Sequence, residues 1–358
     1  MEIFIKFLLS FGILFIMLNI AGLLTWVERK QSALMQDRIG ANRASIFGWR
    51  FFGLFHPLAD ALKMLSKEDF IPEGANKFLF NIAPFLSVVF ALVGFAAIPF
   101  GDRLILGDRV IELQAANINA ALLYIFAMMS MGIYGVVLAG FSSNNNYAFL
   151  GGMRGAAQMI AYEITMGVAI MGVVMVYGTV DLQQLVRGQG AYLFNGWLPK
   201  WGVFVQPLAF LLFLTAATAE TKRIPFDLPE GESEIIGYFI EYSGMKFGMF
   251  FMADLIETIL VSALMTTLFL GGWQVPYLSP TGFHFPWGGV ILLPHLAVAG
   301  LGILSFFIKL SFFIWLLMAI RWTLPRFRYD QLMHLGWKVL LPTSLVNIAV
   351  TAVVIVWR

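Results

Sequence analysis

Four charged side chains fall inside or at the edge of long apolar stretches of this 358-residue sequence, where an ionisable group is costly to bury. They are Glu163, Asp254, Glu257 and Lys309. Asp254 and Glu257 are three residues apart, so a helix would place both on one face. A carboxylic acid removed from water can exchange a proton near neutral pH, which suits a proton relay. The residues leave a second interpretation open, in which each acid is a structural partner of Lys309 or of an arginine.

A second group of carboxylates follows one apolar stretch directly. It contains six acids in 22 residues: Glu220, Asp227, Glu230, Glu232, Glu234 and Glu241. Pro225 and Pro229 argue against a continuous helix, and Gly231 adds a turn or hinge. An ordinary solvated acidic loop is the simpler interpretation. The position of the run, between two apolar stretches, favours a polar funnel that leads to the buried acids.

A third polar segment follows the first apolar stretch. It reads ERK at 28–30 and QDRIGANR at 36–43. Basic residues after a membrane span usually anchor it to anionic lipid. Gly40 and Asn42 instead indicate an ordered turn that would fix the directions of Arg38 and Arg43.

The composition excludes several classes of protein. Hydrophobic residues make up 59% of the chain and charged residues 12%, whereas a soluble domain has about 25% charged residues. The formal net charge of +2 is too small to indicate a nucleic-acid-binding protein. The chain has no Cys and only four isolated His, which argues against a disulfide, a thiolate-bound Fe–S cluster, a haem site or a zinc site. Walker A, G-x-G-x-x-G and H-E-x-x-H motifs are also absent from the sequence.

Eight apolar stretches are long enough to cross a bilayer, whose core requires about 20 apolar residues as helix. The sequence therefore predicts an all-α polytopic membrane protein, with residues 1–358 in one membrane domain. The predicted spans are 7–27, 78–101, 117–141, 155–178, 201–219, 247–273, 290–320 and 339–357. We expect the first to be a retained helix, since its uncharged run exceeds the hydrophobic region of a signal peptide. In the seventh, Pro294 is the expected site of a kink.

Two features of the connecting loops predict how the chain sits in a membrane. Apolar residues at helical spacing over 49–67 predict an amphipathic helix on the membrane surface, with Pro57 as a kink. A helix that packs on a neighbouring subunit is a compatible alternative. Most of the 23 Lys and Arg residues follow odd-numbered spans, so the positive-inside rule puts those loops in the cytoplasm and both termini outside.

These motifs together resemble a known family. The first-loop residues 27–43 and the run AETKRIPFDLPEGESE at 219–234 are similar to two signatures of the H-type subunits of NADH-quinone oxidoreductase, which are core membrane subunits of respiratory complex I. The second motif is long and specific. The resemblance covers the whole chain, including residues 59–63 of the predicted surface helix and residues 241–246.

The resemblance implies a place beside a quinone chamber, with ubiquinone or menaquinone as substrate and with FMN and Fe–S clusters only on partner subunits. The implied partners are Fe–S and quinone-site subunits of a hydrophilic arm and antiporter-like and small membrane subunits, in a bacterial inner membrane rather than an organellar one. The implied proton path comprises Glu163, Glu220 and Asp254. The implied coupling-loop and chamber acids are Asp60, Asp227, Glu230, Glu232 and Glu234, and the implied basic chamber residues are Arg29, Arg38 and Arg223.

The sequence departs from the family pattern at three places. Asp254 stands where the family usually has Glu, and Ala41 where it usually has Pro. The stretch from Glu234 to Glu241 is one residue shorter, so the resemblance assigns no role to Glu241. Two other functions stay open: the corresponding subunit of a membrane-bound hydrogenase, which binds no quinone, and an independent ion-coupled transporter.

Overall fold

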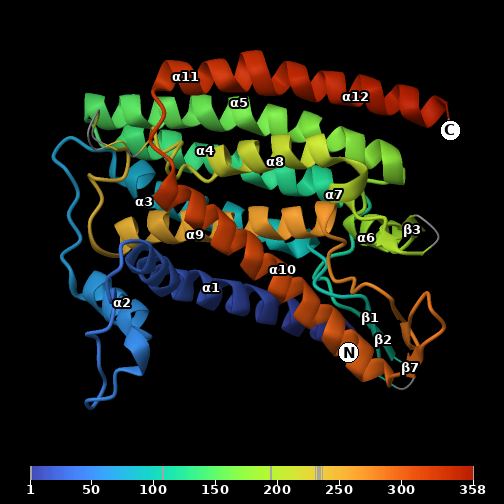
Figure 1. Ribbon diagram of the computed structural model, residues 1–358. Helices are drawn as coiled ribbons and strands as arrows, with labels where there is room; N and C mark the ends of the chain where they lie inside the picture. Colours follow the sequence, from blue (N-terminus) through green and yellow to red (C-terminus); the bar gives the residue numbers. More distant parts are fainter. Residues whose placement is uncertain are drawn as a thin grey trace.

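Long helices lying side by side dominate the computed structural model of the chain, which describes residues 2–106, 109–193, 196–229, 231, 235 and 237–357 (Figure 1). The helices are α1 (Glu2–Met35), α2 (His56–Ser66), α3 (Lys77–Val93), α4 (Ala121–Ser142), α5 (Asn146–Tyr177), α6 (Leu182–Gly188), α7 (Gly202–Val205), α8 (Pro207–Glu220), α9 (Gly244–Phe269), α10 (His295–Thr323), α11 (Tyr329–His334) and α12 (Leu341–Val356). Short 3₁₀ turns are η1 (Phe51–Gly53) and η2 (Gly94–Ala97), and a π-helical segment, η3 (Leu335–Leu340), joins α11 to α12.

The strands are short and belong to three small antiparallel sheets. They are β1 (Arg103–Leu106) with β2 (Arg109–Glu112), β3 (Tyr192–Leu193) with β4 (Leu198–Pro199), and β5 (Leu278–Ser279), β6 (Gly282–His284) and β7 (Val290–Leu292). The first hairpin pairs Arg103 with Glu112. These sheets lie in the loops at one end of the helix bundle (Figure 1).

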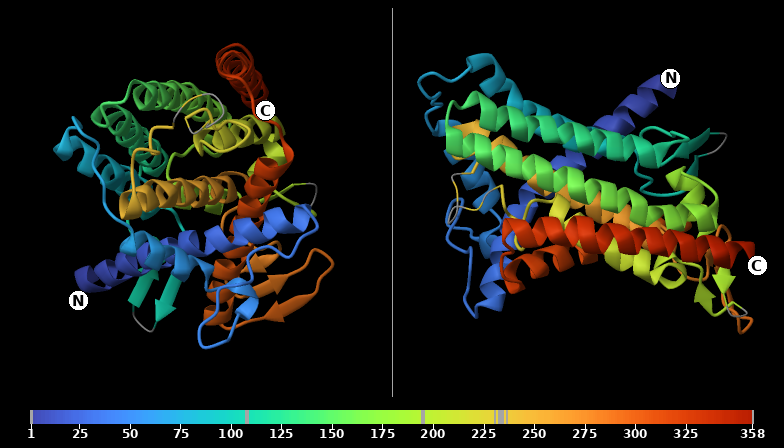
Figure 2. Two further views of the ribbon diagram at one scale, coloured as in Figure 1. Left: turned by 90° about the vertical axis from the view of Figure 1, so that its left-hand side faces the viewer. Right: turned by 90° about the horizontal axis from the view of Figure 1, so that it is seen from above.

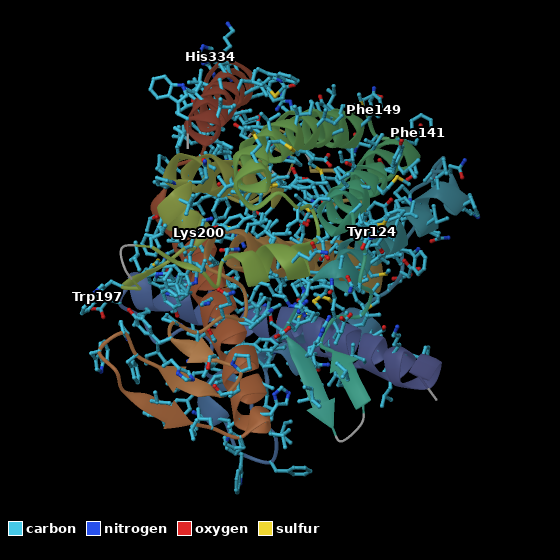
Figure 3. All side chains as sticks on the ribbon, turned by 90° about the vertical axis from the view of Figure 1, so that its right-hand side faces the viewer. Tyr124, Phe141, Phe149, Trp197, Lys200 and His334 are labelled. Atoms are coloured by element: carbon cyan, nitrogen blue, oxygen red, sulfur yellow. The ribbon has the colours of Figure 1, made fainter. Side chains whose placement is uncertain are left out.

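Seven helical segments in the described part of the chain are long and apolar enough to cross a membrane, which confirms the predicted all-α polytopic class. They are Lys6–Met35, Lys77–Ala97, Ala121–Ser142, Asn146–Tyr177, Gly244–Phe269, His295–Thr323 and Tyr329–Val356. The exposed surface of the bundle is rich in large apolar side chains, as expected where a helix meets lipid. Phe141 of α4 and Phe149 of α5 point away from the bundle in the view along its axis (Figure 3).

The predicted span 201–219 is not one continuous helix. Residues 202–205 form the single turn α7, and α8 begins at Pro207 after Gln206 adopts a non-helical conformation. Proline fits the first turn of a helix, where a missing N–H costs nothing, but it cannot continue the helix before it. The apolar helix that remains, α8, has 14 residues.

Two predicted proline kinks are also wrong. Pro294 lies just outside α10 as its N-cap, and part of the stretch before it is strand β7. Pro57 lies in the first turn of α2, so the predicted amphipathic helix over 49–67 begins only at His56. Its apolar residues Leu58, Leu62 and Leu65 are exposed in the isolated chain, in agreement with an amphipathic helix.

Local signals account for where α5 begins and ends. The side chain of Asn145 accepts a hydrogen bond of 2.9 Å from the backbone N–H of Tyr147, a typical N-cap contact. At the other end Gly178 adopts φ +69°, the left-handed conformation that commonly terminates helices. The result is a 32-residue helix that carries Glu163 across the bundle.

α9 lies at the centre of the bundle. Every residue from Ala253 to Phe269 is buried, and the helix packs against α1, α3 and α10. α5 packs against α4, α8 and α12, so that α12 lies beside α5 in both views (Figures 1 and 2). A polar residue in this part of α9 therefore has protein rather than lipid around it.

The two ends of the bundle differ. α1 starts and α12 ends at the end that carries the strands (Figures 1 and 2). The helix α2 and the segment that joins α8 to α9 lie at the opposite end (Figure 1). The start of α1 and the end of α12 at one end of the bundle agree with an even number of passes along it, if the 14-residue apolar helix α8 is counted with the seven longer helices.

Candidate functional site

The two predicted acids of α9 share a single basic partner, Lys222. Its Nζ lies 2.9 Å from Oδ1 of Asp254 and 3.2 Å from Oε2 of Glu257. All three residues are buried, with exposed fractions of 4%, 5% and 7% for Lys222, Asp254 and Glu257. Burial by itself lowers the pKa of Lys222, but the carboxylates of Asp254 and Glu257 outweigh it and raise that pKa well above the usual lysine value. The ammonium therefore stays charged at neutral pH.

Two further acids complete a row across the bundle. Glu220, the last residue of α8, is fully buried, and neither of its carboxylate oxygens has a hydrogen-bond partner in the described part of the chain. It lies close enough to Glu163, Lys222 and Glu257 to interact electrostatically with each. Glu163 is half-buried on α5 and accepts a short hydrogen bond from the hydroxyl of Ser130 on α4. The structure thus gathers Glu163, Glu220, Asp254 and Glu257 from three helices into one buried acid row.

The segment after α8 is held by a buried glutamine on α5. Gln158 is inaccessible to solvent, and its Nε2 donates to the backbone carbonyls of Ala219 at 2.7 Å and Phe226 at 2.6 Å. Within the described residues the chain forms only turns between Glu220 and Gly244, as the two prolines predict. Gln158 therefore fixes the start of this loop relative to the helix that carries Glu163.

A cavity of about 440 Å³ lies between α1, the first loop, α9 and α10, and the predicted chamber residue Arg223 is not among the described residues that line it. We call it the first-loop cavity. Its lining includes Glu28, Arg29, Arg38, His56, Arg321 and Trp322. A volume of this size lies in the range of small-molecule sites, which span roughly 300–1,000 Å³.

Ion pairs organise the wall of the first-loop cavity. Glu28 of α1, 6% exposed, lies 3.4 Å from Nη1 of Arg223 and also pairs with Arg321 of α10. Nη2 of Arg29 lies 2.6 Å from Oδ2 of Asp60 on α2, and this ion pair is partly exposed. Each pair joins segments far apart in the sequence, so the cavity depends on the fold for its shape.

The turn predicted at Gly40 is present beside this cavity. Gly40 has φ +73°, and a Cβ at this position would lie 2.6 Å from the Cβ of Ala33. Only glycine fits such a close approach without displacing α1. Arg38 lines the cavity, and its Nε donates to the side chain of Gln36 at 2.6 Å.

Two described acids of the loop lie beyond the row, Glu241 and Asp227. Glu241 accepts a hydrogen bond of 2.6 Å from Nδ2 of Asn145. Asp227 instead pairs with an arginine. Its two carboxylate oxygens each lie 2.6 Å from the guanidinium of Arg326, in a bidentate pair. Burial raises the pKa of Asp227, and the pair with Arg326 opposes that rise. The predicted acids Glu230, Glu232 and Glu234 lie outside the described residues.

Lys309 does not pair with the acids, contrary to one of the interpretations of the sequence. Its Nζ donates to the carbonyls of Leu270 at 2.7 Å, Gly272 at 3.0 Å and Gln274 at 2.6 Å. It also lies 4.4 Å from the ring centroid of Trp201. A cation is favourable at the C-terminus of a helix, where carbonyl groups lack partners, so Lys309 caps the end of α9.

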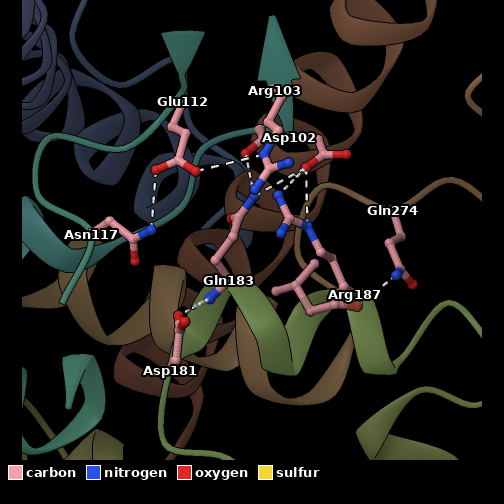
Figure 4. A network of polar contacts seen from close by, with 10 residues as sticks. Asp102, Arg103, Glu112, Asn117, Asp181, Gln183, Arg187 and Gln274 are labelled. Atoms are coloured by element: carbon pink, nitrogen blue, oxygen red, sulfur yellow. Dashed lines mark hydrogen bonds and ion pairs between the residues drawn. The ribbon is translucent and has the colours of Figure 1, made fainter. Parts of the chain in front are cut away.

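A separate polar network occupies the end of the bundle that carries the strands (Figure 4). Arg187 of α6 lies 2.8 Å from Oδ1 of Asp102, and Gln183 donates to the same oxygen at 3.2 Å. Arg103 pairs with Glu112 across the β1–β2 hairpin. This network holds α6 against the hairpin, and it includes none of the predicted site residues.

Sequence reasoning missed Glu28, Lys222, Arg321 and Arg326 as site residues. Each lies near the end of an apolar stretch, where a charged residue ordinarily marks the membrane boundary. The one available signal was the position of Lys222 inside the run AETKRIPFDLPEGESE. Their pairing with buried carboxylates became visible only in the fold.

The bundle and its buried ionisable residues define a polytopic membrane protein with charge inside its membrane-spanning part. The chain belongs to the NADH dehydrogenase family, whose model matches residues 8–352. It is 45% identical to the H-type subunit of the NADH-quinone oxidoreductase of Thermomicrobium roseum, over 99% of this chain and 97% of the relative. It is 44% identical to an H-type subunit from Cytophaga hutchinsonii over 98% of both chains, and 45% identical to one from Geobacter metallireducens over 97% of this chain and 95% of the relative.

Proposed function

We propose that this chain is the membrane subunit at which a proton-translocating NADH-quinone oxidoreductase couples quinone reduction to proton movement. The names of its relatives support this function. The observation that carries it is the segment 220–223, which contributes Glu220 and Lys222 to the buried acid row, while Arg223 pairs with Glu28, a residue of the wall of the first-loop cavity. One short segment thus links a residue that lines a small-molecule cavity to a row of proton-binding groups.

The first-loop cavity is the proposed part of the quinone chamber that this chain supplies. Arg29 and Arg38 would line it, Arg223 would act on it through its ion pair with Glu28, and Asp60 would hold Arg29 in place. The substrate would be ubiquinone or menaquinone, and the electrons would come from FMN and Fe–S clusters on partner chains. The absence of Cys from this sequence is consistent with clusters held elsewhere.

Glu163, Glu220 and Asp254 form the proposed proton path. Reduction of the quinone changes the charge in the chamber, and the segment 220–223 passes this change to the acid row through short-range electrostatics. Charges interact far more strongly in a low-dielectric interior than in water, so a small displacement has a large effect. Protons would then leave the row toward antiporter-like neighbours, while Asp227 and the acids Glu230, Glu232 and Glu234 would shape the loop.

The proposed setting is a bacterial inner membrane, with the chain as a single membrane domain and both termini on the outer side. The excess of Lys and Arg after odd-numbered spans supports this orientation. The helix α2 would then lie at the cytoplasmic surface of the membrane, close to the hydrophilic arm.

Gentle extraction of the tagged chain, followed by mass spectrometry of the proteins that co-purify, tests the proposed function. We expect about a dozen partners, with Fe–S and antiporter-like subunits among them and a flavin-containing NADH-oxidising chain. Co-purification with a nickel hydrogenase would assign the chain to a membrane-bound hydrogenase instead. Purification alone, with ion transport retained, would identify an independent transporter.

A further inference from the structure

Lys222 is a buried cation to which the proposed function gives no task beyond its place in the segment 220–223. It follows α8 by two positions and has φ +54°, in the left-handed region that side chains seldom adopt. Such a conformation persists only where the surroundings impose it. The contacts with Asp254 and Glu257 are the ones that hold the side chain of Lys222 on α9.

The carboxyl groups around Lys222 outnumber its single ammonium. The ionisable groups that face it are Asp254 and Glu257 from α9, Glu220 from α8 and Tyr238 from the loop. The more distant Glu163 acts on Glu220 and Glu257. One ammonium is thus shared by two carboxylates, while Glu220 has no hydrogen-bond partner among the described residues.

Water has little room to compensate for this imbalance. The cavity beside Lys222 and Glu257 is about 10 Å³ and is lined mainly by apolar side chains. That is close to the smallest volume that holds one water molecule. An unpaired ionised carboxylate is costly in such surroundings, so the carboxyl groups that Lys222 does not contact are better suited to carry a proton.

We propose that Lys222 is a positioning residue that keeps Asp254 and Glu257 ionised, so that Glu220 and Glu163 share the exchangeable proton of the row. The inference rests on the proposed function of the acid row. Displacement of the segment 220–223 would withdraw the ammonium from α9. The O–H bond on Glu220 would then break as one forms on Asp254, the next acid of the proposed path, and the total number of protons would stay the same.

The test uses the whole enzyme with its partner chains, reconstituted in liposomes and energised by quinone reduction. The variants are Lys222→Gln, Lys222→Arg and the double variant Lys222→Gln with Glu257→Gln. The matched control is Lys246→Gln, a lysine of α9 whose ammonium lies 2.8 Å from Asp69 away from the row. Protons moved per electron pair and the pH profile of proton movement are measured together with the composition of the complex.

We expect Lys222→Gln to lower the protons moved per electron pair about tenfold, the effect of one unit of proton affinity. The acid limb of its pH profile should move upward by about 1–3 units, the effect of losing an opposite charge beside a carboxylate. Lys222→Arg should retain most of the activity. The double variant should recover toward the unmodified enzyme, because it removes one cation and one anion together.

Two results would overturn the inference. One is a Lys222→Gln enzyme with the proton yield and pH profile of Lys246→Gln. The other is a double variant whose proton yield is as low as that of Lys222→Gln. Should Lys222→Gln fail to assemble, the Lys222→Arg and double variants still test the inference, since both keep the charge balance of the row. An unmodified enzyme that neither reduces quinone nor moves protons would instead refute the proposed function.

Discussion

Lys222 and Arg223 are adjacent in the sequence, but their side chains pair with carboxylates on different helices. Lys222 contacts Asp254 of α9, and Arg223 contacts Glu28 of α1. The first contact belongs to the buried acid row and the second to the wall of the first-loop cavity. A movement of these two residues therefore alters the electrostatics of both places at once, which is what coupling between a ligand and a proton path requires.

The replacement Glu28→Gln should destabilise the protein. It leaves the guanidinium groups of Arg223 and Arg321 without the carboxylate that both contact. Loss of one partner of a buried ion pair costs about 3–5 kcal/mol, and we expect the lower end because Arg321 is partly exposed. Thermal unfolding of the purified complex measures the change, with the exposed Glu73→Gln as control. Equal unfolding temperatures for the two variants would contradict the assigned role of Glu28.

The replacement Asp60→Asn should weaken the use of quinone without changing proton yield. Asp60 holds Arg29 at the first-loop cavity through a partly exposed ion pair, which is worth about 1 kcal/mol at most. We therefore expect the KM for quinone to rise by up to about fivefold. Steady-state kinetics provide the KM, and Asp69→Asn is the control. A fall in protons moved per electron pair would show that Asp60 acts on the acid row instead.

The replacement Gln158→Leu should loosen the start of the loop. The carbonyl of Phe226 loses the donor that Gln158 supplies, whereas the carbonyl of Ala219 keeps the backbone N–H of Lys222 at 3.3 Å, and a buried group left unpaired costs about 1–3 kcal/mol. Both the unfolding temperature and the proton yield should fall. Gln114→Leu is the matched control, because Gln114 is also buried and donates to the carbonyl of Ala97 far from the acid row. If both variants kept a normal proton yield, Gln158 would serve stability alone.

The sequence predicted the acids of the row because charge inside an apolar stretch is visible without a structure. Glu163, Asp254 and Glu257 are of this kind, and all three lie in the row. Their partner was not predictable in the same way. Lys309 is the lysine inside a predicted span, yet it caps carbonyls at the end of α9, while Lys222 from a loop reaches the acids.

Seven of the eight predicted spans were likewise predictable from the length of the apolar stretches, whereas local breaks depended on single residues. The prediction of a span over 201–219 overlooked that Pro207 starts a helix rather than continuing one. The cavity beside α1 was beyond sequence reasoning, because its wall combines residues from α1, the first loop, α9 and α10. Residues that come from separate elements share no periodicity or motif that the sequence could reveal.

The most direct test of the coupling role is the proton yield of Glu163→Gln in membrane vesicles. Glu163 lies in the row, and its carboxylate is held by Ser130 rather than by a cation in the described part of the chain. Gln keeps the shape and a hydrogen bond but cannot exchange a proton, so we expect an assembled enzyme whose proton movement falls at least about tenfold. Glu112→Gln, on the β1–β2 hairpin, should behave as the unmodified enzyme. Normal proton movement by Glu163→Gln would contradict the proposed proton path.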